Sequence, residues 1–414
     1  MKTTEFMKYA NSFQAVTVPG LERIAALMRH LGNPEETLRF IHVAGTNGKG
    51  SVCANLASIL KEAGFKVGKY ISPNLISVNE RISISGVDIS DEDLSRILSI
   101  IEPLCRQVAD EVGSEPTQFE IWTAAAFVYF FENKCDYVVL EVGLGGEFDA
   151  TNVIPSCECS VITRLGIDHS AYLGNTIEKI AEAKAGIIKM DSRLGKVFTV
   201  RQEEKALDVI KKKADSSNLA TIIAEPTPIG RDGAYEKFLL LGKEYKSGIS
   251  GFHQIENASL AILVAKEMGI DEKAISRGVS LARNPARFEL IRENPTVIYD
   301  GGHNENGIKA LTLSIERYFG KVPKTVIFAA MRDKDIEESL KLLSEYDTEF
   351  IFTTVKNNPR AASAEELSKK ASEYGFFGEH FEDIRDAYLA ALKKGRLTII
   401  CGSLYLYKDF KEIL

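Results

Sequence analysis

Short, continuous apolar runs of strand length recur along the chain, and they constrain its fold more than any other feature. Such runs are typical of strands that are buried on both faces of a sheet. Helical spacing lies between them, as where Val52, Leu56 and Ile59 share one face. This alternation predicts α/β architecture with parallel-rich sheets. The runs lie at residues 39–44, 137–142, 159–163, 296–300, 325–330, 349–355 and 397–401.

A charged segment bracketed by two prolines, residues 283–297, is the best candidate boundary between domains. A new series of strands and helices begins after it. The length of 414 residues suits about two or three domains. We predict two α/β domains, residues 1–287 and 288–414, and the cleft between two domains is a favoured place for a ligand.

Composition and charge narrow the class of protein. The formal net charge of −7 argues against a broad nucleic-acid footprint, although a local basic pocket for an anionic ligand is compatible with it. The six cysteines are scattered and the chain begins without a signal-like segment, which favours a reducing cytoplasm. No apolar stretch reaches the roughly 18 residues of a membrane span. We therefore expect a cytoplasmic protein that binds neither nucleic acid nor a membrane. We also expect a monomer.

A glycine-rich turn with one lysine follows the first apolar run. The common nucleotide-binding pattern does not fit this turn, because Val43 stands where its first glycine belongs and Gly50 where Ser or Thr is expected. Between a buried strand and a helix, however, backbone N–H groups and the helix dipole favour an anion, and Lys49 adds positive charge. The turn predicts a phosphate cradle, with a plain glycine turn as the alternative. Its residues are Gly45, Thr46, Asn47, Gly48, Lys49, Gly50 and Ser51.

Acidic and histidine side chains follow other buried runs. Glu141 ends one run, which suits an oxygen ligand for the magnesium ion that accompanies a triphosphate, although such an acid is as often a salt-bridge partner. Asp168 with His169, and Asp300 with His303, also follow buried runs. Ligands of α/β proteins bind beyond the carboxyl ends of strands. These residues are therefore candidates for one shared site, with a structural role for each histidine as the alternative.

A series of short motifs runs in order through most of the chain. They are HVAGTNGKGS (42–51), SPNL (72–75), ERI (80–82), EVGLGG (141–146), DATN (149–152), DHSAYLGNT (168–176), KAGI (184–187), HQIENA (253–258), PARFE (285–289) and DGGHN (300–304). Together they resemble the motifs of the folylpolyglutamate synthase and dihydrofolate synthase family. This family belongs to the Mur-type amide ligases, whose phosphate loop has the shorter G-T-N-G-K form.

The resemblance implies a P-loop-type ATP-binding domain followed by a smaller Rossmann-like domain. It also implies ATP-dependent joining of L-glutamate to a folate-type carboxylate, either folate or dihydropteroate, through an acyl phosphate, with two magnesium sites. The resemblance implies phosphate binding by Gly48, Lys49 and Ser51, and magnesium binding by Ser72, Glu141 and His169. It implies nucleotide contacts by Asn257, Arg287 and Asp300, and glutamate contacts by His303 and Ser403. The residues implied in catalysis are Lys49, Lys184, His169 and His303.

Lys184 has two different interpretations. Helical spacing alone predicts a solvent-exposed lysine on an amphipathic helix. In the family that the chain resembles, the lysine of this segment is carbamylated and helps to hold the second magnesium ion. An ammonium group would repel the metal, whereas a carbamate supplies oxygen atoms and negative charge. The resemblance therefore implies that Lys184 is carbamylated.

Two acids depart from the family pattern. Glu147 stands where an arginine is expected after GLGG, and Glu305 stands where a proline is expected after HN. Acids beside a site for anionic substrates would repel a polyglutamate tail. A related Mur-type amide ligase that acts on a different acid or amino acid is therefore one alternative. A non-catalytic ATP-binding homologue is the other.

Overall fold

The computed structural model describes residues 19–414, which divide into two compact units. Both units are α/β with parallel-rich sheets, which confirms the predicted fold class. The first unit includes the described residues up to Thr227 together with Leu240–Tyr245 and Glu256–Ala282, and the second includes Pro228–Leu239, Lys246–Ile255 and Arg283–Leu414.

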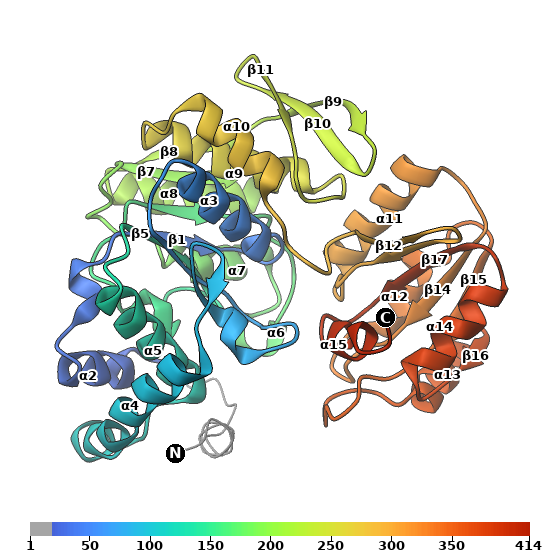
Figure 1. Ribbon diagram of the computed structural model, residues 1–414, viewed down its shortest axis with the longest axis horizontal. Helices are drawn as coiled ribbons and strands as arrows, with labels where there is room; N and C mark the ends of the chain where they lie inside the picture. The colour runs from blue at the N-terminus through green and yellow to red at the C-terminus, as the bar shows by residue number, and fades with distance from the viewer. Residues whose placement is uncertain (1–18) are drawn as a thin grey trace. The chain divides into compact units, whose positions relative to one another are not determined.

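An eight-stranded sheet forms the core of the first unit, in the order β4-β3-β2-β5-β1-β6-β7-β8. Figure 1 shows β1, β5, β7 and β8 of this sheet. Six of these strands are parallel, and the short strands β3 and β4 pair antiparallel at one edge. Every residue of β1, β5 and β6 is buried, which explains their continuous apolar sequences. The strands are β1 (Phe40–Ala44), β2 (Val67–Tyr70), β3 (Ile82–Ile84), β4 (Val87–Asp88), β5 (Tyr137–Glu141), β6 (Cys159–Ile162), β7 (Lys196–Val200) and β8 (Ala220–Ala224).

Helices pack against this sheet. Helix α3 contacts β1, β2 and β5 and lies beside α10 (Figure 1). Gly278 allows this close approach, because a Cβ there would lie 2.4 Å from the Cα of Ile59. The helices are α2 (Glu22–His30), α3 (Lys49–Glu62), α4 (Asp91–Val112), α5 (Gln118–Glu132), α6 (Ser170–Leu173), α7 (Ile177–Ala185), α8 (Glu204–Ser216), α9 (Gln254–Glu267) and α10 (Glu272–Leu281), with 3-10 turns at Pro34–Thr37, Val78–Arg81 and Ala150–Val153.

The strand order brings the segments that follow several strands together at one edge of the sheet. Strand β1 lies between β5 and β6, with Val43 opposite Glu141 and Ala44 opposite Ile162. Because these strands are parallel, their carboxyl ends meet at the same edge. The glycine-rich turn after β1, the acid that ends β5 and the segment after β6 are therefore neighbours.

A six-stranded sheet, in the order β12-β13-β17-β14-β15-β16, forms the core of the second unit. Only β12 is antiparallel to its neighbour. A small third sheet has the order β11-β10-β9. The remaining elements are β9 (Thr227–Asp232), β10 (Tyr235–Leu240), β11 (Lys243–Lys246), β12 (Glu289–Glu293), β13 (Thr296–Tyr299), β14 (Lys324–Phe328), β15 (Thr348–Phe352), β16 (Gly378–His380), β17 (Leu397–Cys401), α11 (Glu305–Phe319), α12 (Ile336–Leu343), α13 (Ala364–Glu373), α14 (Ile384–Lys393) and α15 (Leu406–Lys411).

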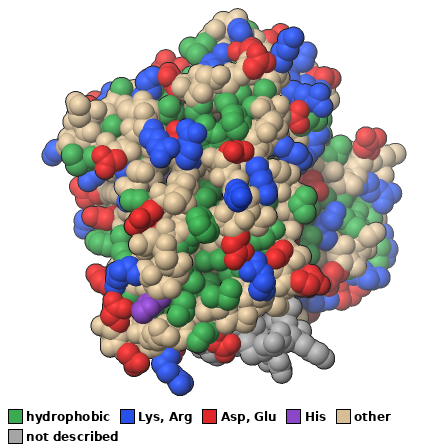
Figure 2. Space-filling model, turned by 60° about the vertical axis from the view of Figure 1, so that its left-hand side comes forward, with side chains coloured by type: hydrophobic (Ala, Val, Ile, Leu, Met, Phe, Trp, Pro, Cys, Tyr) green, Lys and Arg blue, Asp and Glu red, His purple; other side chains and the backbone are tan. Residues whose placement is uncertain are grey.

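The surface in Figure 2 carries acidic and basic side chains interspersed with apolar ones. All six cysteines are buried, where each packs as a small apolar side chain. In the described part of the chain, no helix is long and apolar enough to cross a membrane.

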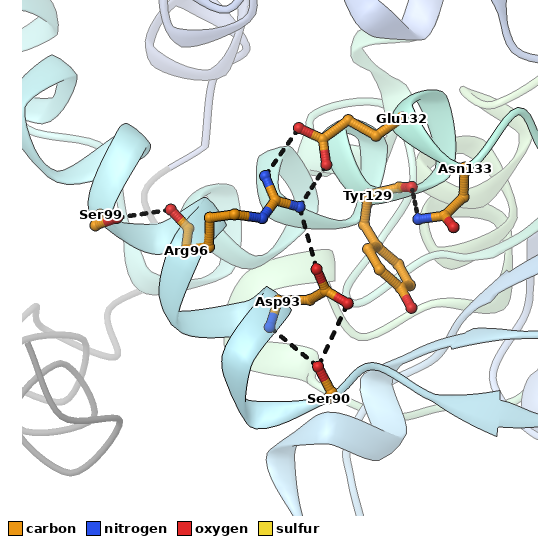
Figure 3. A network of polar contacts seen from close by, with 7 residues as sticks. All are labelled: Ser90, Asp93, Arg96, Ser99, Tyr129, Glu132 and Asn133. Carbon is orange, nitrogen blue, oxygen red and sulfur yellow. Dashed lines mark hydrogen bonds and ion pairs between the residues drawn. The ribbon is translucent and has the colours of Figure 1, made fainter.

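Two ion pairs that join helices of the first unit differ in burial. Arg23 Nη2 of α2 lies 3.0 Å from Glu120 Oε1 of α5, and these side chains are only 8% and 5% exposed. Arg96 of α4 donates to both carboxylate oxygens of Glu132 of α5, at 3.1 and 2.6 Å (Figure 3). The side chains of this second pair are 46% and 35% exposed. Removal of one partner leaves a buried uncompensated charge only in the first pair.

We predict that Arg23→Ala lowers the free energy of unfolding by about 3–5 kcal/mol. Arg96→Ala should lower it by at most about 1 kcal/mol, because water already screens the exposed pair. Urea denaturation followed by the fluorescence of Trp122, the single tryptophan of the chain, reports on this region directly because Trp122 lies in α5. An equal loss in the two variants would contradict the prediction.

Candidate active site

The glycine-rich turn between β1 and α3 packs too closely for side chains at two positions. Gly45 has φ +149°, and a Cβ there would lie 1.8 Å from Thr163 Oγ1. Gly48 has φ +94°, and its Cβ would lie 2.2 Å from Asn257 Oδ1. Glycine is required at both positions because its backbone is free to adopt positive φ and nothing projects from its Cα. The turn is thus fixed against β6 and against Asn257 of α9.

The amides of the turn fall into two groups. The N–H groups of Thr46 and Asn47 both donate to Arg164 O at 3.1 Å, so they hold the turn against the segment after β6. The N–H groups of Gly48, Lys49 and Gly50 have no acceptor among residues 19–414. These three groups form the N-terminus of α3, where the helix dipole also favours negative charge. This end of α3 is therefore suited to an anion.

Two lysines converge on one carbonyl oxygen of the turn. Gly45 O accepts hydrogen bonds from Lys49 Nζ at 3.1 Å and from Lys184 Nζ at 2.8 Å. Lys184 is 5% exposed, so the prediction from helical spacing that it is solvent-exposed was wrong: α7 turns this face toward the glycine-rich turn. Burial, together with the positive charge of Lys49, lowers the pKa of Lys184 to about 7. A substantial fraction of Lys184 is therefore an uncharged amine near neutral pH.

The structure brings Glu141 and Ser72 together. Glu141 is 4% exposed, and its Oε2 accepts a hydrogen bond from the N–H of Ser72 at 3.2 Å. His169 is exposed, with φ +53°, and its N–H donates to Asp168 Oδ1 at 2.9 Å. The described residues contain no group of three or more His, Cys, Asp or Glu side chains that could hold a metal ion. Magnesium commonly binds one or two carboxylates and completes its shell with phosphate and water oxygens, so Glu141 and Ser72 suit it.

A buried polar chain links β1 to the glycine-rich loop after β5. Asp149 Oδ2 accepts the N–H of Leu144 at 2.8 Å, and its Oδ1 accepts the hydroxyl of Thr151 at 2.5 Å. The Thr151 oxygen therefore accepts from His42 Nε2, at 2.9 Å. Neither His42 nor Asp149 received a role from the sequence, although a histidine inside an apolar run was a usable signal.

Asp300 organises a tight turn in the second unit. It is 4% exposed, its Oδ1 accepts the N–H of Gly302 at 2.7 Å and its Oδ2 accepts that of Phe288 at 2.8 Å. A Cβ on Gly301 would lie 2.8 Å from Arg287 Nη1, so the guanidinium group lies against this turn. Arg287 and Asp300 therefore both lie at this turn.

His303 and Ser403 lie at the same edge of the second sheet. Gly301 O accepts from His303 Nδ1 at 2.9 Å, so the proton of the neutral imidazole is assigned to Nδ1. Ser403 is buried, its carbonyl accepts from the Tyr299 hydroxyl at 2.9 Å and its Oγ accepts from the N–H of Tyr405 at 3.2 Å. Strands β13 and β17 are parallel neighbours, which brings the segments after them together.

Family models match both units. Residues 43–265 match the Mur ligase middle domain, and residues 286–404 match the Mur ligase glutamate ligase domain. The dihydrofolate synthase/folylpolyglutamate synthase of Bacillus subtilis is 38% identical, over 96% of this chain and 95% of that protein. The chain belongs to this family of Mur ligases.

Solved structures of family members share the fold. Mycobacterium tuberculosis folylpolyglutamate synthase complexed with ADP and AMPPCP matches with a TM-score of 0.90 and 29% identity, over 100% of this chain and 98% of that one. Escherichia coli FolC in complex with DHPP and ADP matches with a TM-score of 0.87 and 27% identity, over 100% and 97%. The family and the fold class predicted from the motifs are thus confirmed.

We predict that His42 makes the fold sensitive to acid. Burial lowers its pKa from the ordinary 6.5 to about 3, so folding favours the neutral imidazole. The contribution of the neutral imidazole to the free energy of unfolding is complete above pH 6.5. It is lost as the pH falls toward 3, by up to about 1.4 kcal/mol per pH unit. The urea midpoint of wild type should therefore fall more steeply between about pH 6 and about pH 4 than that of His42→Gln, which cannot titrate. Parallel pH profiles would contradict this.

Proposed function

We propose that this protein is an ATP-dependent ligase that joins L-glutamate to a carboxylate of a folate-type acceptor and forms ADP and phosphate. The observation that carries the proposal is the N-terminus of α3, where free N–H groups, Lys49 and Lys184 meet at the carboxyl edge of a parallel sheet. The names of the relatives, dihydrofolate synthase and folylpolyglutamate synthase, support folate and dihydropteroate as acceptors.

The turn from Gly45 to Ser51 would bind the nucleotide phosphates. Its free amides and Lys49 would take phosphate oxygens, while Asn257 contacts the turn at Gly48. The ADP and AMPPCP in the Mycobacterium tuberculosis structure support a nucleotide here. Arg287 and Asp300 are our candidates for further nucleotide contacts, and His303 and Ser403 for the incoming glutamate.

Ser72, Glu141, His169 and a carbamylated Lys184 would hold magnesium. Bound magnesium supplies positive charge that offsets the negative charge of a phosphoryl group. Among these residues, Glu141 and Ser72 have the strongest support, because a hydrogen bond already joins them. The low pKa of Lys184 supports its modification, since only an uncharged amine reacts with carbon dioxide.

The proposed reaction has two steps. An oxygen of the acceptor carboxylate attacks the γ-phosphorus of ATP, the bond to ADP breaks, and an acyl phosphate forms. The amine of glutamate then attacks the acyl carbon, phosphate leaves, and the amine loses a proton. Lys49 and the N–H groups of α3 stabilise negative charge on the phosphoryl oxygens, and the remaining binding residues align the substrates. No step needs a cysteine nucleophile, which agrees with the burial of all six cysteines.

The direct test supplies the protein with ATP, magnesium and glutamate plus either dihydropteroate or a reduced folate. Mass spectrometry should show an acceptor that has gained glutamyl residues, with ADP released in equal amount. Turnover with only a different acid or amino acid would instead identify a related amide ligase. ATP binding without ADP release for any pair would identify a non-catalytic homologue.

We predict that Lys49→Ala lowers acceptor-dependent ADP release by at least about 100-fold, because a cation that contacts the phosphates is lost. Lys61→Ala is the matched control, since Lys61 is an exposed lysine of the same helix. Both variants should keep the wild-type thermal transition. Near-normal turnover of a folded Lys49→Ala protein would refute the phosphate role.

We predict that Lys184→Arg also loses ligation, because arginine keeps the positive charge and does not form a carbamate. Wild-type protein incubated with ¹³C-labelled bicarbonate should show a carbamate ¹³C signal that Lys184→Arg lacks. Lys189→Arg is the control, because Lys189 is a nearby lysine that donates to Asn152 O instead of to the phosphate loop. Full activity of Lys184→Arg would show that carbamylation is not needed.

A further inference from the structure

The two unexpected acids of this chain have different electrostatic surroundings. Glu305 is the first residue of α11, forms an ion pair with Lys309 one turn later, and lies at the helix end that favours negative charge. Glu147 is exposed, and among residues 19–414 no Lys, Arg or His side chain pairs with it. Glu305 thus has a positively charged partner, whereas Glu147 has none among these residues.

The backbone of Glu147 is firmly held. Its N–H donates to Ala183 O at 2.9 Å, and its carbonyl accepts from Asn152 Nδ2, also at 2.9 Å. Gly186 packs directly against it, since a Cβ on Gly186 would lie 2.4 Å from the Glu147 Cβ. The side chain of Glu147 therefore starts from a fixed point between the glycine-rich loop after β5 and the end of α7.

This point is joined through α7 to Lys184 and to the turn of the proposed phosphate site. Glu147 bonds to Ala183, the residue before Lys184, and Lys184 Nζ in turn reaches Gly45 O of the phosphate loop. The neighbouring lysine Lys189 does not form an ion pair with Glu147, and its Nζ donates to Asn152 O. An anionic acceptor that enters beside this loop meets the unpaired carboxylate.

We propose that Glu147 is a specificity-determining residue that favours acceptors with short glutamate tails. The inference rests on the proposed function, because it concerns the acceptor of that reaction. Each glutamyl residue added to a tail adds one net negative charge, whereas dihydropteroate has a single carboxylate and no tail. Repulsion between exposed like charges changes an equilibrium by about two- to five-fold. This repulsion weakens at higher salt, because dissolved ions screen the charges.

The test compares kcat/KM for dihydropteroate and for a triglutamyl folate in wild type and Glu147→Gln at low salt. We expect Glu147→Gln to raise the triglutamyl-to-dihydropteroate ratio by about two- to five-fold, mainly through a lower KM for the triglutamyl acceptor. The gain should shrink at high salt. Glu147→Asp, which keeps the charge, should retain the wild-type ratio.

Glu305→Gln is the matched control, since it removes an acid that Lys309 already neutralises. An unchanged ratio in Glu147→Gln, or an equal change in Glu305→Gln, overturns the role of Glu147 while leaving the proposed ligase intact. Wild-type protein that glutamylates no folate-type acceptor refutes the proposed function and this inference with it.

Discussion

The carbonyl oxygen of Gly45 accepts hydrogen bonds from two lysine side chains, and the first-unit site is built around this contact. Two lysine side chains are brought together here by a turn that leaves no room for a side chain at Gly45 or Gly48. Their repulsion adds to burial in lowering the pKa of Lys184 to about 7. In the proposed site, a phosphate group at the N-terminus of α3 would relieve this repulsion, as would carbamylation of Lys184.

How much of the fold could be predicted depended on burial. Strands buried on both faces carry continuous apolar runs, so β1, β5, β6, β13, β14, β15 and β17 were all predicted at nearly their observed bounds. Strand β2 was missed because Gly68 and Lys69 interrupt its pattern. The exposed strand β9, rich in polar residues, was missed for the related reason that no face of it is buried.

The residues of the candidate site also differ in how well their positions could be predicted from the sequence. The alternating pattern predicts that the glycine-rich turn and Glu141 lie at the same edge of a parallel sheet, but only the strand order, which the sequence does not show, makes them neighbours. Helical spacing shows that Lys184 lies on one face of α7, but it cannot show which neighbour covers that face, and the spacing therefore suggested solvent. Asp149 acts through backbone N–H groups of Leu144 and Thr151, and contacts of this kind leave no mark on residue type.

The nucleotide part and the acceptor part of the proposed site are formed by different kinds of groups. In the proposed site, phosphate binding would depend on backbone N–H groups and on glycines whose neighbours leave no room for a side chain, so few substitutions at Gly45 or Gly48 are compatible with the fold. The loop at Glu147 exposes its side chain to solvent, where a change of charge costs the fold little. Substitutions there can therefore alter acceptor preference while the nucleotide half of the site is unchanged. The effect of an acid that departs from the family pattern depends on the charges around it. Glu147 and Glu305 therefore differ in their expected effect on acceptor preference.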